Sequence, residues 1–131
     1  MRLTNLFWTF KYPILVFLIN QFVFNPLLVY QKLPWFDIPM HLLGGSVVAL
    51  SGMQLLDEFR KDEKYQGSRF VSFLFVVSFV ALIAVAWEWY EWLLSFIFSS
   101  SPQNINDTLK DLFFGIMGGM VGAIRIFAEV K

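Results

Sequence analysis

The feature that most constrains the fold is a series of four apolar runs, each about as long as a membrane-crossing helix. We place the helices at about residues 6–30, 38–56, 70–98 and 108–127. A bilayer core about 30 Å thick needs about 20 apolar residues per helix, so each run is long enough. Hydrophobic residues make up 57% of the chain and charged residues only 15%, which is too apolar for a soluble domain of this size. The sequence therefore predicts an all-α integral membrane four-helix bundle, a single transmembrane domain over residues 1–131.

The composition also excludes several classes of function. The chain has no cysteine, which rules out disulfides, thiolate metal sites and cysteine nucleophiles. Ten basic and ten acidic side chains balance, so no net positive charge points to a nucleic acid partner. We therefore expect membrane lipid as the partner, with homo-oligomerisation left open.

The distribution of lysine and arginine predicts the orientation in the membrane. If the chain crosses the membrane four times, only Lys32 and Lys110 lie on the side opposite the termini. The other eight lie on the side that holds both termini: Arg2, Lys11, Arg60, Lys61, Lys64, Arg69, Arg125 and Lys131. By the positive-inside rule, both termini are expected in the cytoplasm. We also expect the first run to be a retained span rather than a signal peptide, with a kink or broken end caused by Pro13 and Pro26.

Ionisable side chains are costly in hydrocarbon, at roughly 2.5 to 3.5 kcal/mol each near the bilayer centre, and here a set of them gathers at the outer ends of three helices. The set has five carboxyl groups and the single histidine: Asp37, His41, Glu88, Glu91, Asp107 and Asp111. Its members pair at i, i+3 or i, i+4 spacing and so share a helix face. Glycine and alanine continue each face inward, which favours close helix packing. We therefore expect the six side chains to converge near the outer membrane boundary.

Such a cluster needs a compensating partner. Six charged, dry and unpaired groups would cost on the order of 15 kcal/mol, as much as the whole stability of a small domain. Lys110 is close in sequence, but helix geometry is expected to turn it away from Asp107 and Asp111. A divalent metal ion from solution is then the simplest partner, with bound protons or a water-filled cavity as alternatives. Oxygen ligands with one nitrogen suit Mg, Mn, Ca or ferrous Fe, and suit Zn somewhat less.

Each motif also has a simpler structural interpretation. Asp37 and Asp107 fit helix N-caps, and Thr108 with Asp111 fits a capping box. The aromatic residues of 87–92 could form an interfacial belt whose glutamates point to water. The single histidine could be structural. The gathering of all three pairs in one layer favours a site over these alternatives.

Three sequence blocks resemble a known family of membrane proteins. The blocks are Asp37-Ile-Pro-Met-His41 followed by Gly44-Gly45, then Trp87-Glu88-Trp89-Tyr90-Glu91-Trp92, then Asp107-Thr-Leu-Lys-Asp111 followed by Gly115 and Gly119. Together they are similar to the small bacterial membrane proteins of the YjdF-like type. The first and last blocks also resemble the VanZ-like group, named for a teicoplanin-resistance protein. The resemblance covers roughly residues 35–123 and implies a multi-pass protein of the bacterial or archaeal plasma (inner) membrane, but no agreed activity.

Three hypotheses for the function follow. A site at the membrane boundary favours a metal-dependent protein that holds or acts on a polar lipid headgroup, as a hydrolase or transferase. In it the six residues are metal ligands, and Glu88 or Glu91 is the catalytic general base toward a metal-bound water. The second hypothesis is an ion or proton transporter, although few polar residues continue inward. The third is a non-catalytic membrane scaffold that packs through its glycine faces, so whether the protein is an enzyme stays open.

Overall fold

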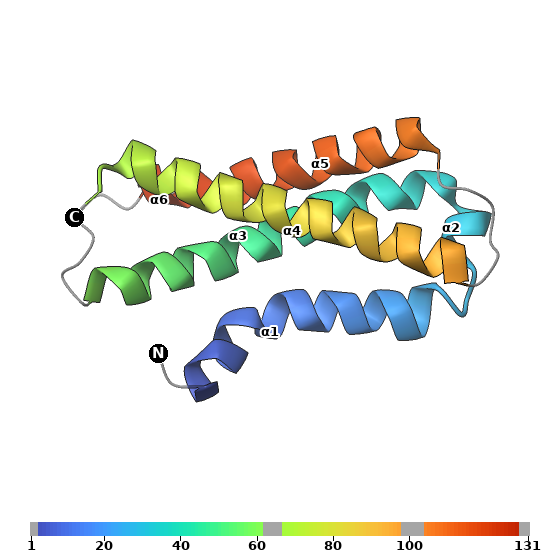
Figure 1. Cartoon of the computed structure of the whole chain (residues 1–131), viewed down its shortest axis with the longest axis horizontal. Coiled ribbons are helices and arrows are strands. Elements are labelled where there is room, and N and C mark those ends of the chain that lie inside the picture. The colour runs from blue at the N-terminus through green and yellow to red at the C-terminus, as the bar shows by residue number, and fades with distance from the viewer. Residues whose placement is uncertain (1–2, 62–66, 98–103, 129–131) are drawn as a thin grey trace.

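The computed structural model describes residues 3–61, 67–97 and 104–128, and the regular structure in these ranges is entirely helical. This confirms the predicted all-α class. Four long helices run alternately in opposite directions (Figure 1). They are α1 (Leu3–Ile19), α3 (Asp37–Lys61), α4 (Arg69–Ile97) and α5 (Ile105–Ala123). The short elements are the π-helix η1 (Asn20–Phe24), α2 (Val29–Lys32), the 3-10 helix η2 (Pro34–Phe36) and α6 (Arg125–Ala128).

Three stretches of the described residues are long and apolar enough to cross a membrane. They are Phe7–Phe24, Pro34–Lys61 and Arg69–Ile97. Large apolar side chains cover their outer faces, as the exposed Leu82 and Phe96 illustrate, which is typical of helices that contact lipid. The crossing of the membrane by α5, and the cytoplasmic location of the termini, stay predictions.

Glycines allow α5 to pack closely against both α3 and α4. A Cβ atom added to Gly45 of α3 would collide with the backbone carbonyl of Gly115, and one added to Gly118 would collide with that of Leu42. Gly119 packs closely against α4, because a Cβ atom added there would lie within 3 Å of the Val80 side chain. The small-residue faces predicted from the sequence are therefore packing faces.

The first predicted span is broken near its end. Its α-helical part stops at Ile19, a π-helical turn follows, and the chain reverses at Leu28, which has a φ of 55°. Pro26 has no backbone N–H to continue the helix, so the predicted broken end is found there. Pro13, in contrast, lies inside α1. The reversal carries Tyr30 back toward the bundle, where it borders the cavity described below.

Two other helix ends differ from the sequence prediction. Helix α3 continues from Asp37 to Lys61 rather than stopping near residue 56. Helix α5 begins at residue 105, because the Asn104 side chain caps it by accepting a hydrogen bond of 3.0 Å from the Asn106 backbone N–H. Asp107 is therefore inside the first turn, and its interpretation as an N-cap is wrong. The predicted third-helix end at residue 98 lies outside the described residues, as do Arg2, Lys64 and Lys131 of the charge count.

Candidate metal centre and adjoining cavity

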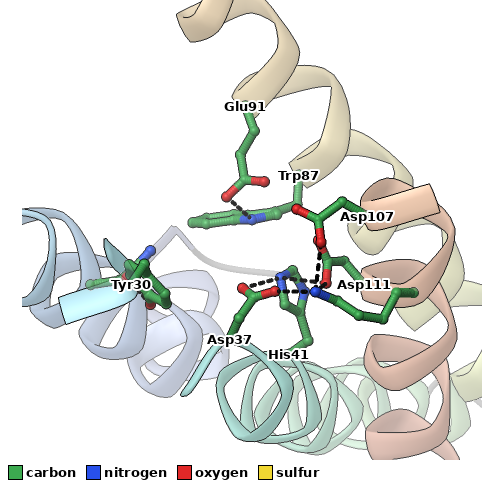
Figure 2. Close-up of polar contacts among 9 residues, drawn as sticks. Tyr30, Asp37, His41, Trp87, Glu91, Asp107 and Asp111 are labelled. Carbon is green, nitrogen blue, oxygen red and sulfur yellow. Dashed lines mark hydrogen bonds and ion pairs between the residues drawn. The ribbon is translucent and has the colours of Figure 1, made fainter. Parts of the chain in front are cut away.

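Three of the six predicted site residues lie together where α3 and α5 begin. His41 Nε2 lies 3.3 Å from Asp37 Oδ1 and 3.7 Å from Asp111 Oδ1, and Figure 2 shows the three side chains pointing toward one another. One ligand atom from each lies within 4.8 Å of the others. Two ligands bound at tetrahedral angles to one ion, with bonds of about 2.1 Å, lie about 3.4 Å apart. The spacing of this group therefore fits a shared metal ion.

The environment of Asp111 is the strongest indication that this group binds a cation. Its residue is 3% exposed, and among the described residues its Oδ1 atom has no hydrogen-bond partner. A buried carboxylate oxygen without a partner costs on the order of 1 to 3 kcal/mol or more. This oxygen lies between His41 Nε2 at 3.7 Å and Lys110 Nζ at 3.4 Å without a hydrogen bond to either, and a bound cation or proton would satisfy it.

Lys110 also takes part, and the prediction that it points away from the acids is wrong. Its Nζ atom lies 2.6 Å from Asp107 Oδ1, 2.9 Å from Asp37 Oδ2 and 3.4 Å from Asp111 Oδ1. Helix spacing sets only the direction of the Cβ atom, whereas the four-carbon side chain of a lysine can bend back along the helix surface. An internal ammonium group thus supplies part of the positive charge that the sequence analysis assigned to an ion from solution. Three carboxylates still outnumber it.

The two glutamates of α4 lie outside this group. Glu88 is 6% exposed and is not part of the three-residue group. Glu91 accepts a hydrogen bond of 2.9 Å from Trp87 Nε1, and Figure 2 shows the indole ring between Glu91 and the Asp37 group. The close group therefore includes neither glutamate, although Glu91 lines the same cavity as Asp37 and His41. The two glutamates differ by about 60° in direction because they are three residues apart on a helix.

The alternative of an aromatic belt holds only for part of the 87–92 block. Trp89 is 71% exposed and Trp92 is also exposed, as expected of rings at a membrane interface. Glu88 is buried rather than directed to water. This block therefore divides into an outer aromatic face and an inner acidic face.

A cavity of about 370 Å³ lies between α1 on one side and α3 and α4 on the other. This volume is within the range of roughly 300 to 1,000 Å³ of small-molecule sites. Its polar lining consists of Asn20, Asn25, Tyr30, Asp37, His41 and Glu91, with the Trp87 indole beside them. Most of the remaining wall is apolar: Phe10, Pro13, Ile14, Val16, Phe17, Met40, Val47, Val48, Val80, Ile83 and Ala84, with Gly44, Gly45 and Gly115. The cavity therefore has an amphipathic lining that includes two residues of the candidate metal centre.

Tyr30 and Trp87 both line this cavity, and Figure 2 shows Tyr30 apart from the Asp37 group. Its hydroxyl donates a hydrogen bond to Asn20 Oδ1 of the π-helical turn. Burial, followed by the negative charges of Asp37 and Glu91, raises the pKa of Tyr30 to about 12, so its phenol stays protonated. The sequence analysis missed Tyr30 and Trp87 as lining residues. The contact between Tyr30 and Asn20 depends on the chain reversal at Leu28, which the sequence does not reveal. Trp87 lies one helical turn before Glu91, so its position beside Glu91 could have been predicted.

Comparison with known proteins assigns the chain to a family. The family model described as "Predicted membrane protein (DUF2238)" matches residues 2–130. The chain belongs to this family. It is the family of the YjdF-like proteins, so that resemblance is confirmed and the chain is a membrane protein. The relation to the VanZ-like group stays a prediction. No curated protein and no solved structure matches the chain.

Proposed function

We propose that this membrane protein binds a divalent metal ion through Asp37, His41 and Asp111, and that the ion holds the polar head of an amphiphile in the adjoining cavity. The observation that carries the proposal is the buried Asp111 Oδ1 atom. It has no hydrogen-bond partner among the described residues, and its ion-pair contacts are loose, at 3.4 Å from Lys110 Nζ and 3.7 Å from His41 Nε2. Two carboxylates and one imidazole suit zinc, manganese or ferrous iron, since calcium and magnesium prefer more oxygen ligands.

Lys110 is compatible with such an ion. Its ammonium contacts Asp37 through Oδ2, whereas His41 faces Oδ1 of the same carboxylate. An ion on the His41 side would therefore share Asp37 with the lysine through separate oxygens, although the two cations would share the single Asp111 Oδ1 atom. Because two positive charges so close repel each other, Lys110 should weaken the binding of the ion and make it reversible.

The cavity supports an amphiphile as the ligand. Asp37 and His41 belong both to the metal group and to the cavity lining, and beyond them the wall is largely apolar. A ligand with its polar head at the ion would place a hydrocarbon chain against this wall, where burial of apolar surface contributes about 25 cal/mol per Å².

Any chemistry on the bound head would involve Glu91 rather than Glu88. A general base must come within hydrogen-bond reach of the group it deprotonates. Glu91 borders the cavity, whereas Glu88 is not among its lining residues. Hydrolysis or group transfer at the headgroup is therefore a proposal in which Glu91 has the base role.

The polar side chains further along α3 do not support a transport pathway. The single hydroxyl proton of Ser46 is within hydrogen-bond reach of the backbone carbonyls of both Leu42 and Gly118, and Ser51 donates a hydrogen bond to the backbone carbonyl of Thr9. These hydroxyl groups thus stabilise helix contacts. Val48, Ala49, Val76 and Val80 form the core around them.

Metal analysis of the purified full chain tests the proposal. After equilibrium dialysis against zinc or manganese in mild detergent, elemental analysis should find a stoichiometric amount of metal in the wild type. Asp111→Asn and His41→Gln should lose it, because each removes a ligand. Asp107→Asn should keep it, since Asp107 lies outside the three-residue group. Equal metal content in wild type and Asp111→Asn, both still helical by circular dichroism, would overturn the proposal.

A further inference from the structure

We infer that the ligand of the cavity is a phospholipid whose head carries a protonated amine, and that Glu91 and Trp87 bind this amine. The inference rests on the proposed function, which makes the cavity the ligand site. It adds the chemical class of the ligand. In this arrangement the phosphate of the head lies toward the Asp37 and His41 side, and the amine lies toward Glu91. The hydrocarbon chain lies between α1 on one side and α3 and α4 on the other.

The charges of the cavity favour a cationic group. Its ionisable lining residues, among the described part of the chain, are Asp37, Glu91, Tyr30 and His41, with no lysine or arginine. The ammonium of Lys110 lies beyond this lining, on the α5 side. Charge interactions are stronger beside a largely apolar wall than in bulk water, because the surroundings are less polar. A purely anionic head would meet carboxylates at both ends of the polar lining, whereas an ammonium would be attracted to Glu91.

The surroundings of Glu91 suit an amine in particular. Trp87 Nε1 donates a hydrogen bond of 2.9 Å to Glu91 Oε1, which holds the carboxylate at the N–H edge of the indole and leaves the ring face available for a cation (Figure 2). Phe17 of α1 meets the indole edge-on, with ring centroids 5.8 Å apart. A carboxylate beside aromatic faces is a recurrent means of binding ammonium groups, through an ion pair together with cation–π attraction.

The wall below these residues has room for a hydrocarbon chain. A Cβ atom added to Gly44 would meet nothing within 4 Å, and Gly44 lines the cavity. A glycine inside a helix costs up to about 1 kcal/mol relative to alanine. Unlike Gly45, this glycine is not required for helix packing, so its small size keeps cavity volume open.

Two lysophospholipids of the same chain length test the inference. We would titrate lysophosphatidylethanolamine and lysophosphatidylglycerol into the zinc-loaded full chain in a nonionic detergent and measure binding by native mass spectrometry. The ethanolamine lipid should bind about tenfold more tightly, the amount expected of a charged hydrogen bond of about 1.4 kcal/mol. Glu91→Gln should reduce its affinity to that of the glycerol lipid. Glu88→Gln, the matched control on the same helix, does not line the cavity and should keep the preference.

A second variant tests the location of the chain. Gly44→Leu should abolish the binding of both lipids without unfolding the protein, because its side chain would enter open space. Equal affinities of the two lipids for the wild type, or unchanged binding in Gly44→Leu, would overturn the inference. If ethanolamine alone bound as tightly as the lipid, the claim that the ligand is an amphiphile would be overturned.

The result is separable from the proposed metal site. An amine preference that persists in metal-free protein and in Asp111→Asn would support the lipid inference while the metal proposal fails. Metal retention without any preference between the lipids would contradict the inference and leave the metal site standing.

Discussion

The Lys110 ammonium lies 2.9 Å from Asp37 Oδ2 and so joins the second turn of α5 to the first residue of α3. The same ammonium contacts Asp107 and Asp111 of its own helix. This ion pair gives the acidic cluster an internal cation. It explains how three carboxylates can lie close together at the ends of two packed helices before any ion binds.

The internal cation makes the effect of Lys110→Gln informative. Removal of the ammonium removes a repulsive charge beside the proposed ion, so zinc should bind about tenfold more tightly. Without metal the same variant should unfold more easily, by about 1 kcal/mol, because the carboxylates lose their counter-charge. Calorimetric titration and thermal unfolding measure the two effects. Lys32→Gln is the control, since that lysine bonds only the backbone carbonyl of Leu27 among the described contacts. Weaker zinc binding in Lys110→Gln would contradict the proposed geometry.

Addition and removal of metal should shift the stability of the protein. An ion at a concentration 100 times its dissociation constant stabilises the folded state by about 2.7 kcal/mol, because it binds the folded chain alone. We expect zinc or manganese to raise the unfolding temperature of the wild type and a chelator to reverse the rise. Asp111→Asn, which lacks a ligand, should not respond. An equal rise in that variant would indicate that the metal acts elsewhere on the protein.

Two adjacent glycines of α3 should respond in opposite ways to alanine. Gly45→Ala forces a methyl group against the Gly115 carbonyl and should destabilise the protein by about 1 to 3 kcal/mol, the usual cost of overpacking. Gly44→Ala meets open space and should stabilise the helix by up to about 1 kcal/mol. Thermal unfolding in the same detergent compares them. A similar loss in both variants would mean that Gly44 is also a packing residue.

The sequence predicted those parts of the structure that follow from helix periodicity. Asp37 and His41 share one face of α3, and the glycines beneath them bring α5 close, so the meeting of both residues with Asp111 could be anticipated. Periodicity could not place Lys110, because the end of a long side chain is free of the backbone direction. Nor could it separate Glu91 from the group, since a Trp87 ring lies between them in space (Figure 2).

The lining of the cavity was beyond sequence reasoning for a different reason. Tyr30 reaches Asn20 only because the chain reverses between them, and a single break at Pro26 does not reveal the direction of the chain after it. The cavity itself depends on how α1 packs against α3 and α4. Its apolar wall looks, in the sequence, like any other membrane helix face.

The reversal after α1 offers a last prediction, at Leu28. This residue has a φ of 55°, in the left-handed region that non-glycine side chains rarely adopt, and it is the one non-glycine residue with positive φ in the described ranges. Leu28→Gly removes the steric penalty and should stabilise the protein by about 1 kcal/mol. Leu27→Gly, the neighbouring control without a positive φ, should give no gain, because it only increases the freedom of the unfolded chain. Unfolding temperatures in detergent decide between them, and a loss of stability in Leu28→Gly would mean that its side chain contributes more than its backbone conformation costs.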